Sequence, residues 1–177
     1  MRDLETGRPW HAARRLRGIV SERPDPDSFT VLLLARAEAG WGHWSAVWDL
    51  LSEREWSVGD APDALWLRGR AAEEEGAWAE AAEAYRRYLD AAAPGLTGAG
   101  PGPARPVEVR RARSLFHAGR GDEAVEVLAA IAEDPSSTRG WAALELAHAA
   151  AESGAVEFTR RVLRWVDRPH ASQTWEL

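Results

Sequence analysis

Cysteine, lysine and asparagine are absent from this 177-residue chain, and its single methionine is Met1. Without cysteine the chain can form neither disulfides nor thiolate metal sites, and it has no cysteine nucleophile. Without lysine it cannot contain the Gly-x-x-x-x-Gly-Lys loop that cradles phosphates. These absences exclude several classes of enzyme and metalloprotein.

Long apolar runs and excess positive charge are also missing. No window approaches the ~18 apolar residues of a membrane span, and the N-terminus lacks the apolar run of a secretory signal. The formal net charge of −6 argues against a nucleic-acid partner. The five histidines show no metal-ligand spacing. We therefore expect no metal, no cofactor and no membrane span, and the sequence as given indicates a cytoplasmic protein.

A spaced series of glycines is the most informative feature that is present. Gly7, Gly40, Gly76, Gly119 and Gly154 lie between predicted helices, at steps of 33, 36, 43 and 35 residues. A helix-turn-helix repeat has a period of about 34 residues. The spacing therefore predicts a stack of helical hairpins.

Side-chain size follows the same series. Five positions after each glycine comes a small residue, and nine positions after it comes a large apolar residue at four of the five glycines. The small residues are Ala12, Ser45, Ala81, Ala124 and Thr159, and the large ones are Leu16, Tyr85, Leu128 and Leu163, with Asp49 as the exception. One extra residue in the turn at 41–43 would restore the phase through Ala46 and Leu50.

Helical periodicity and capping signals predict helices throughout, and no segment alternates with the period of two that strands need. The expected helices are 9–20, 29–39, 43–52, 64–75, 77–92, 107–118, 122–133, 141–153 and 156–166, with a Pro- and Gly-rich loop at 94–106. We expect an all-α fold, a right-handed α-solenoid of about five antiparallel helix pairs. It forms one domain over 1–177, and both ends suggest a piece of a longer array.

The best-patterned stretch resembles a tetratricopeptide repeat (TPR). It runs through 64–69 and 76–78 to Ala81, Tyr85 and Leu89. The resemblance implies that Gly69 and Ala81 are the small residues at which two helices cross, with Tyr85 as the large packing residue.

A narrower resemblance concerns 7–17 and 32–44, which look like the non-catalytic superhelical region of bacterial soluble-type lytic transglycosylases. That family carries a catalytic Glu-Ser pair followed by Gly-Leu-Met-Gln. Because Met1 is the only methionine, the second motif cannot occur here. Glu152 and Ser153 are interpreted as part of an interhelix turn, so the sequence predicts no enzyme.

The first helix of each pair is expected to line a concave face that could hold a peptide or a polar glycan. The candidate binding residues on this face are Trp66, Arg70, Glu73, Arg113, His117, Trp141, His148 and Glu152. Among the other tryptophans, Trp78 is expected to pack between helices, whereas Trp41, Trp44 and Trp56 are expected to be partly exposed.

Three functions remain open at this stage. The first is the non-catalytic scaffold of a lytic transglycosylase, which implies peptidoglycan as a partner through a parent enzyme in the cell envelope. The second is a stand-alone cytoplasmic TPR adaptor for a peptide or protein partner, and the third is the sensor array of a transcription regulator. A homodimer through the open solenoid ends would favour the adaptor.

Overall fold

The computed structural model describes residues 7–56, 62–91, 104–132 and 138–164. All regular secondary structure within these ranges is helical, as the sequence predicts. The helices are α2 (Pro9–Ser21), α3 (Ser28–Ala39), α4 (Trp44–Leu51), α5 (Pro62–Glu74), α6 (Trp78–Ala91), α7 (Ala104–His117), α8 (Gly121–Ala132), α9 (Thr138–Glu152) and α10 (Val156–Leu163).

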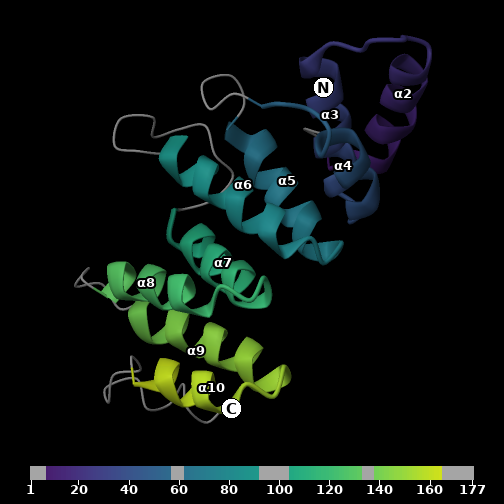
Figure 1. Ribbon diagram of the computed structural model, residues 1–177. Helices are drawn as coiled ribbons and strands as arrows, with labels where there is room; N and C mark the ends of the chain where they lie inside the picture. The colour runs from purple at the N-terminus through teal and green to yellow at the C-terminus, as the bar shows by residue number, and fades with distance from the viewer. Residues whose placement is uncertain (1–6, 57–61, 92–103, 133–137, 165–177) are drawn as a thin grey trace.

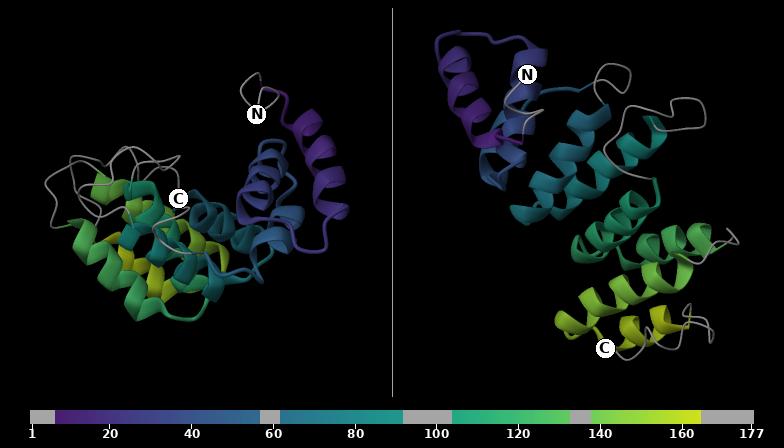
Figure 2. Two further views of the ribbon diagram at one scale, coloured as in Figure 1. Left: turned by 90° about the horizontal axis from the view of Figure 1, so that it is seen from above. Right: turned by 180° about the vertical axis from the view of Figure 1, so that it is seen from behind.

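The helices stack in chain order along an arc, so that each packs mainly on its neighbours in sequence (Figures 1 and 2). Four complete pairs lie within the described ranges: α3 with α4, α5 with α6, α7 with α8, and α9 with α10. Helix α2 precedes them and packs on α3. The molecule is therefore an α-solenoid, and the described part holds four pairs and one additional helix where about five pairs were expected.

The C-terminal end of the loop predicted at 94–106 was placed too late. Helix α7 begins at Ala104, so Pro106 lies in its first turn. Proline is tolerated there because the amide groups of the first turn have no partner within the helix. The rest of that loop falls largely outside the described residues.

The turns within the four pairs are built alike, as Schellman motifs closed by a glycine. In the α5–α6 turn the Ala77 amide donates to the Ala72 carbonyl at 2.8 Å, and Gly76 has a φ of 72°. The same pattern recurs around Gly42, Gly119 and Gly154. Only glycine adopts this left-handed conformation without steric cost, so the repeating glycine marks each helix end.

The expected phase of the second turn was wrong. Gly40 has an ordinary helical φ of −62°, and the left-handed residue is Gly42, at φ 85°. The positions five and nine residues later are therefore Val47 and Leu51, and both are fully buried. The phase slips by two residues because Gly40 and Trp41 still belong to the helix end.

Gly40 has a separate reason to be glycine. A Cβ on this residue would lie 2.7 Å from the Cβ of Pro9, at the start of α2. Glycine therefore permits the close approach of α2 to the end of α3.

Candidate binding face on the first helices

One position on the first helices carries a basic residue in every complete pair. It lies six residues before the left-handed glycine of the turn and is occupied by Arg36, Arg70, Arg113 and His148. Because the repeats are equivalent, the four side chains lie at the same place on α3, α5, α7 and α9. We call this set the basic column.

Three members of the basic column have acidic partners. Arg36 pairs with Asp63 of the next first helix. Arg70 donates to Glu73 at 2.6 Å and to Glu74 at 3.0 Å, and His148 Nδ1 lies 3.9 Å from the carboxylate of Glu152. Here the charge of the column is largely neutralised within the molecule.

Glu73 joins two repeats. Its carboxylate is 6% exposed and accepts hydrogen bonds of 2.6 Å from both Arg70 and Arg110 of α7. Burial, and the negative charge of Glu73 nearby, raise the pKa of the Tyr85 hydroxyl. Both arginine hydrogen bonds to Glu73 go to Oε2, which links α5 to α7, whereas the buried Oε1 has no hydrogen-bond partner.

Arg113 differs from the rest of the column. Within the described residues it forms no ion pair with a carboxylate, and its buried Nε has no hydrogen-bond partner. Four residues later in α7, the buried Nε2 of His117 also has no partner. The His117 ring stacks on Trp78 with ring centroids 4.3 Å apart and planes 24° apart. Unpaired polar atoms beside an aromatic ring make this the part of the face best suited to a ligand.

The pKa of His117 is lowered by burial and by the positive charge of Arg113. Its neutral form is therefore favoured by the fold, and its contribution to stability is full above pH 6.5 and is lost as the pH falls through the depressed pKa. We expect its NMR titration midpoint to lie below 6.5 and to rise when Arg113 is replaced by methionine. An equal change in Arg86→Met, which removes a charge from α6, would contradict this cause.

Aromatic residues flank the column. The Arg70 guanidinium carbon lies over the ring of Trp44 of α4, 5.1 Å from the ring centroid. Trp66 is half-buried against the largest core cluster. Trp41 is 41% exposed and Trp44 is half-buried, as expected. Trp56 is only 4% exposed, so that expectation was wrong. Its indole N–H finds a partner in the Leu51 carbonyl at 3.3 Å, which permits burial.

The structure brings only some of the predicted site residues together. Arg70 and Glu73 are in direct contact, Arg113 adjoins His117, and His148 faces an exposed Glu152. The Trp141 side chain lies outside the described part. The sequence analysis did not place Arg36, Arg110, Trp44 and Trp78 among the candidate binding residues, although each contacts a residue of the basic column, its acidic partners or His117, or belongs to the column. Counting back from the correct glycine, Gly42, would have found Arg36.

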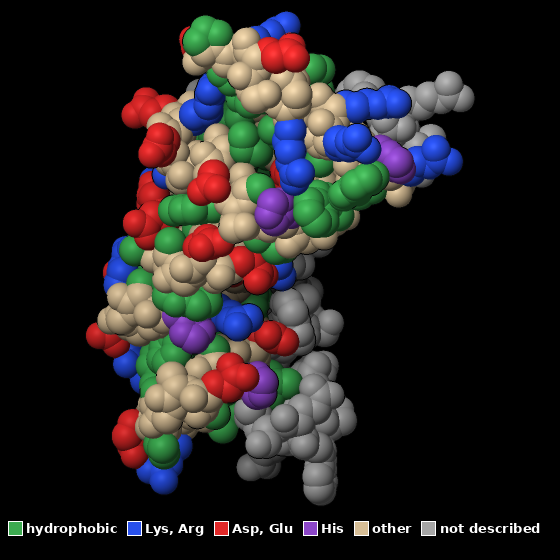
Figure 3. All heavy atoms as spheres, turned by 90° about the vertical axis from the view of Figure 1, so that its right-hand side faces the viewer, with side chains coloured by type: hydrophobic (Ala, Val, Ile, Leu, Met, Phe, Trp, Pro, Cys, Tyr) green, Lys and Arg blue, Asp and Glu red, His purple; other side chains and the backbone are tan. Residues whose placement is uncertain are grey.

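Glu152 and Ser153, which resemble a catalytic Glu-Ser pair in sequence, have structural roles at the end of α9. Glu152 is exposed at the end of α9, and the Ser153 hydroxyl donates to the Ala150 carbonyl at 2.9 Å. In the described ranges no group of histidine and carboxylate side chains could hold a metal ion, and no helix there is long and apolar enough to cross a membrane. One side of the molecule shows acidic, basic and histidine side chains intermixed over several repeats (Figure 3).

Comparison with known proteins identifies the fold. No family model matches the sequence, and no curated protein matches it. Among solved structures, the chain is similar to a protein of Podosopora anserina described as kinesin light chain nearly identical TPR-like repeats. The identity is 22% and the TM-score 0.55, over 93% of this chain and 88% of that chain. The chain has a TPR-like repeat fold.

A single-substitution variant of the same protein matches this TPR-like chain over nearly its whole length. Its TM-score is 0.57 at 22% identity, covering 99% of this chain and 92% of that chain. The broader resemblance to TPR repeats is thereby confirmed for the fold. The narrower resemblance to lytic transglycosylases receives no support from these comparisons.

Proposed function

We propose that this chain is a non-catalytic TPR-like module that binds a peptide or protein segment on the face of its first helices. The observation that carries the proposal is Arg113, whose Nε is buried without a partner beside the Trp78–His117 stack. No carboxylate among the described residues pairs with Arg113, and its side chain is partly exposed. A carboxylate on the bound segment would form a charge-assisted hydrogen bond with this guanidinium.

The flanking residues support this choice of ligand. Arg70 and Arg110 already pair with Glu73, whereas Arg113, three residues after Arg110 in α7, has no carboxylate partner among the described residues. Trp78, which is half-buried beside His117, would contact an apolar part of the same segment. A short peptide with an acidic side chain next to an apolar one matches this arrangement.

The test is a peptide-array selection with the full chain, followed by titration of the selected peptides using tryptophan fluorescence. We expect carboxylate-containing peptides to be enriched, and Arg113→Met to weaken them at least tenfold. The control is Arg86→Met, which removes the same charge from the exposed side of α6, where Arg86 pairs with Glu83 and Asp90. Equal losses in the two variants, or no enrichment of acidic peptides, would overturn the proposal.

The assignment to the superhelical region of a lytic transglycosylase remains a prediction that rests on residues 7–17 and 32–44. It is tested separately, by co-sedimentation of the chain with purified peptidoglycan sacculi. Sedimentation lost on adding free muropeptides would support it. A chain that stays in the supernatant would favour the stand-alone adaptor.

A further inference from the structure

Charged groups from three helices surround His117, within the site proposed above. Arg113 precedes it by one turn in α7, Glu73 acts on it from α5, and Glu152 acts on it from α9. Among the described residues, these three are the charged groups that influence its titration. From α6, the Trp78 ring stacks on the His117 ring with centroids 4.3 Å apart. His117 therefore belongs to one cluster of groups contributed by four helices.

The two carboxylates of this cluster act only weakly on His117. Glu73 Oε2 already accepts hydrogen bonds of 2.6 Å from two arginines, and the Glu152 side chain is 60% exposed, so water screens its charge. Arg113, in contrast, has no carboxylate partner in the part of the chain that the structure describes. Burial and the charge of Arg113 therefore outweigh the two carboxylates and lower the pKa of His117.

A buried ring nitrogen adds to the cost of charging His117. Its Nε2 is buried and has no hydrogen-bond partner among the described residues. A protonated ring carries a hydrogen on both nitrogens, so it would place an unpaired N–H in this position. Without a ligand, the fold therefore favours the neutral ring.

A carboxylate bound at Arg113 would change this balance. It would bring a negative charge within one helical turn of His117 and offset the positive charge of Arg113. A nearby opposite charge favours the charged form of a histidine. Since binding and protonation then affect each other, each would strengthen the other to the same degree.

We propose that binding of an acidic segment at Arg113 is coupled to the uptake of a proton by His117, so that the chain binds this segment more tightly as the pH falls from 7.5 to 5.5. This inference rests on the function proposed above. The bound state holds more protons than the free state, so acid favours its formation. The carboxylate of the segment does not produce the effect, because a glutamate side chain has a pKa of about 4.3 and stays charged in this range.

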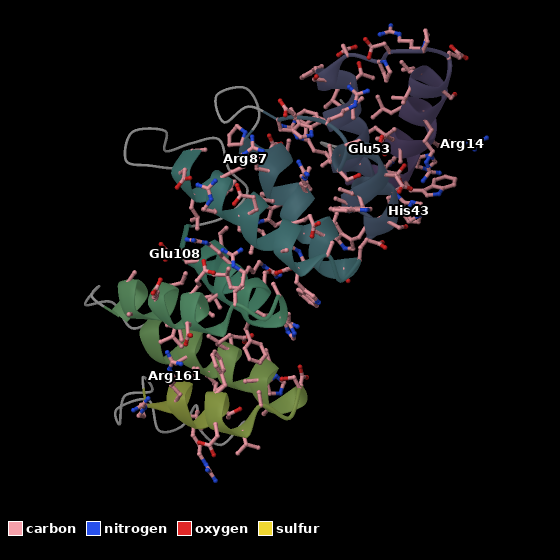
Figure 4. The ribbon with its side chains drawn as sticks, in the orientation of Figure 1. Arg14, His43, Glu53, Arg87, Glu108 and Arg161 are labelled. Carbon is pink, nitrogen blue, oxygen red and sulfur yellow. The ribbon has the colours of Figure 1, made fainter. Side chains whose placement is uncertain are left out.

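Two histidines outside the binding face are candidates for a control. His43 binds Glu38 beside α4, toward the N-terminal end of the arc (Figure 4), so replacing it would disturb a buried carboxylate. His11 is exposed in α2, where its ring contacts Trp10. We therefore choose His11, whose replacement removes an imidazole without changing the binding face.

The probe is the carboxylate-containing peptide that binds most tightly in the array, synthesised with both termini blocked so that a side chain carries its charge. Isothermal titration calorimetry measures its affinity for the full chain from pH 5.5 to 7.5, and two buffers of different ionisation enthalpy report proton uptake at pH 6. We expect binding at least threefold tighter at pH 5.5 than at pH 7.5, with net proton uptake. The NMR titration midpoint of His117 should rise when the peptide is saturating.

His117→Gln should bind the peptide equally well at both pH values, whereas His11→Gln should keep the pH dependence of the wild type. Circular dichroism at pH 5.5 checks that both variants fold, and if His117→Gln does not, the His117 midpoint in the wild type decides. Affinity independent of pH, an unchanged midpoint, or the same pH dependence in the two variants would overturn the coupling and leave the proposed function intact. An array without carboxylate-containing hits would overturn both.

Discussion

Gly69→Leu is expected to abolish the cooperative unfolding transition of the chain or to lower its midpoint steeply. A Cβ at this position would lie 2.5, 2.8 and 2.9 Å from three atoms of the Tyr85 ring. Tyr85 is fully buried in the largest core cluster, so the ring has no space into which to move. Overpacking of this kind costs about 1 to 3 kcal/mol for small insertions, and a leucine adds three further carbon atoms. Thermal melts followed by circular dichroism measure the effect.

The control for Gly69 is Gly18, in the last turn of α2. A Cβ at Gly18 meets nothing within 4 Å. Gly18→Ala should therefore raise stability by about 0.5 to 1 kcal/mol through helix propensity alone. Gly69→Ala should lower stability despite the same gain, and Tyr85→Leu in the same chain should restore part of the loss. Equal melting temperatures for Gly18→Ala and Gly69→Ala would show that the two helices do not cross at Gly69.

Much of this fold could be predicted because one local rule repeats. A helix end that needs a left-handed residue selects glycine, and helix crossings select small side chains such as Gly69 and Ala81. The same rule misled at the second turn, where two glycines stand close together. Gly40 is needed for the approach of Pro9, which is a tertiary contact, and only Gly42 adopts the left-handed conformation.

The binding face was less predictable, because its chemistry depends on pairing between repeats. The residue types Arg70, Glu73 and Arg113 were all visible as candidates. In the structure Glu73 pairs with two arginines, whereas Arg113 has no carboxylate partner among the described residues. This difference depends on how α5 and α7 pack. Likewise, the burial of Trp56 depends on a carbonyl that helix α4 presents to it.

Glu38 is the clearest feature that the sequence analysis missed. It lies four residues before the turn glycine, where the other turns have Ala72, Leu115 and Ala150, and its side chain is 1% exposed. Four donors surround its carboxylate. They are Arg17 Nε and Nη2 at 2.6 Å each, His43 Nδ1 at 3.0 Å and Trp41 Nε1 at 3.1 Å. A repeat alignment centred on Gly42 would have revealed a charge at an apolar position.

Because of this arrangement, removing Arg17 and removing Glu38 should cost unequal amounts of stability. Burial tends to raise the pKa of Glu38, but the hydrogen bonds from Arg17 and His43 outweigh it and hold the pKa below 4.5. Removing Arg17 would leave a buried carboxylate with fewer donors. Removing Glu38 would leave an arginine that is 46% exposed and can turn to water. The first change should therefore be the more damaging one.

We expect Arg17→Met to destabilise the chain by about 2 to 4 kcal/mol at pH 7, and Glu38→Leu to cost much less, since leucine occupies the equivalent place in α7. In the wild type, the contribution of Glu38 is present above pH 4.5 and is lost as the pH falls through its depressed pKa. In Arg17→Met, burial dominates and raises that pKa, so the contribution is lost as the pH rises instead. Urea unfolding from pH 3.5 to 7 should therefore show the two proteins diverging with increasing pH. A constant difference across this range, or a larger cost for Glu38→Leu, would contradict a buried carboxylate held by Arg17.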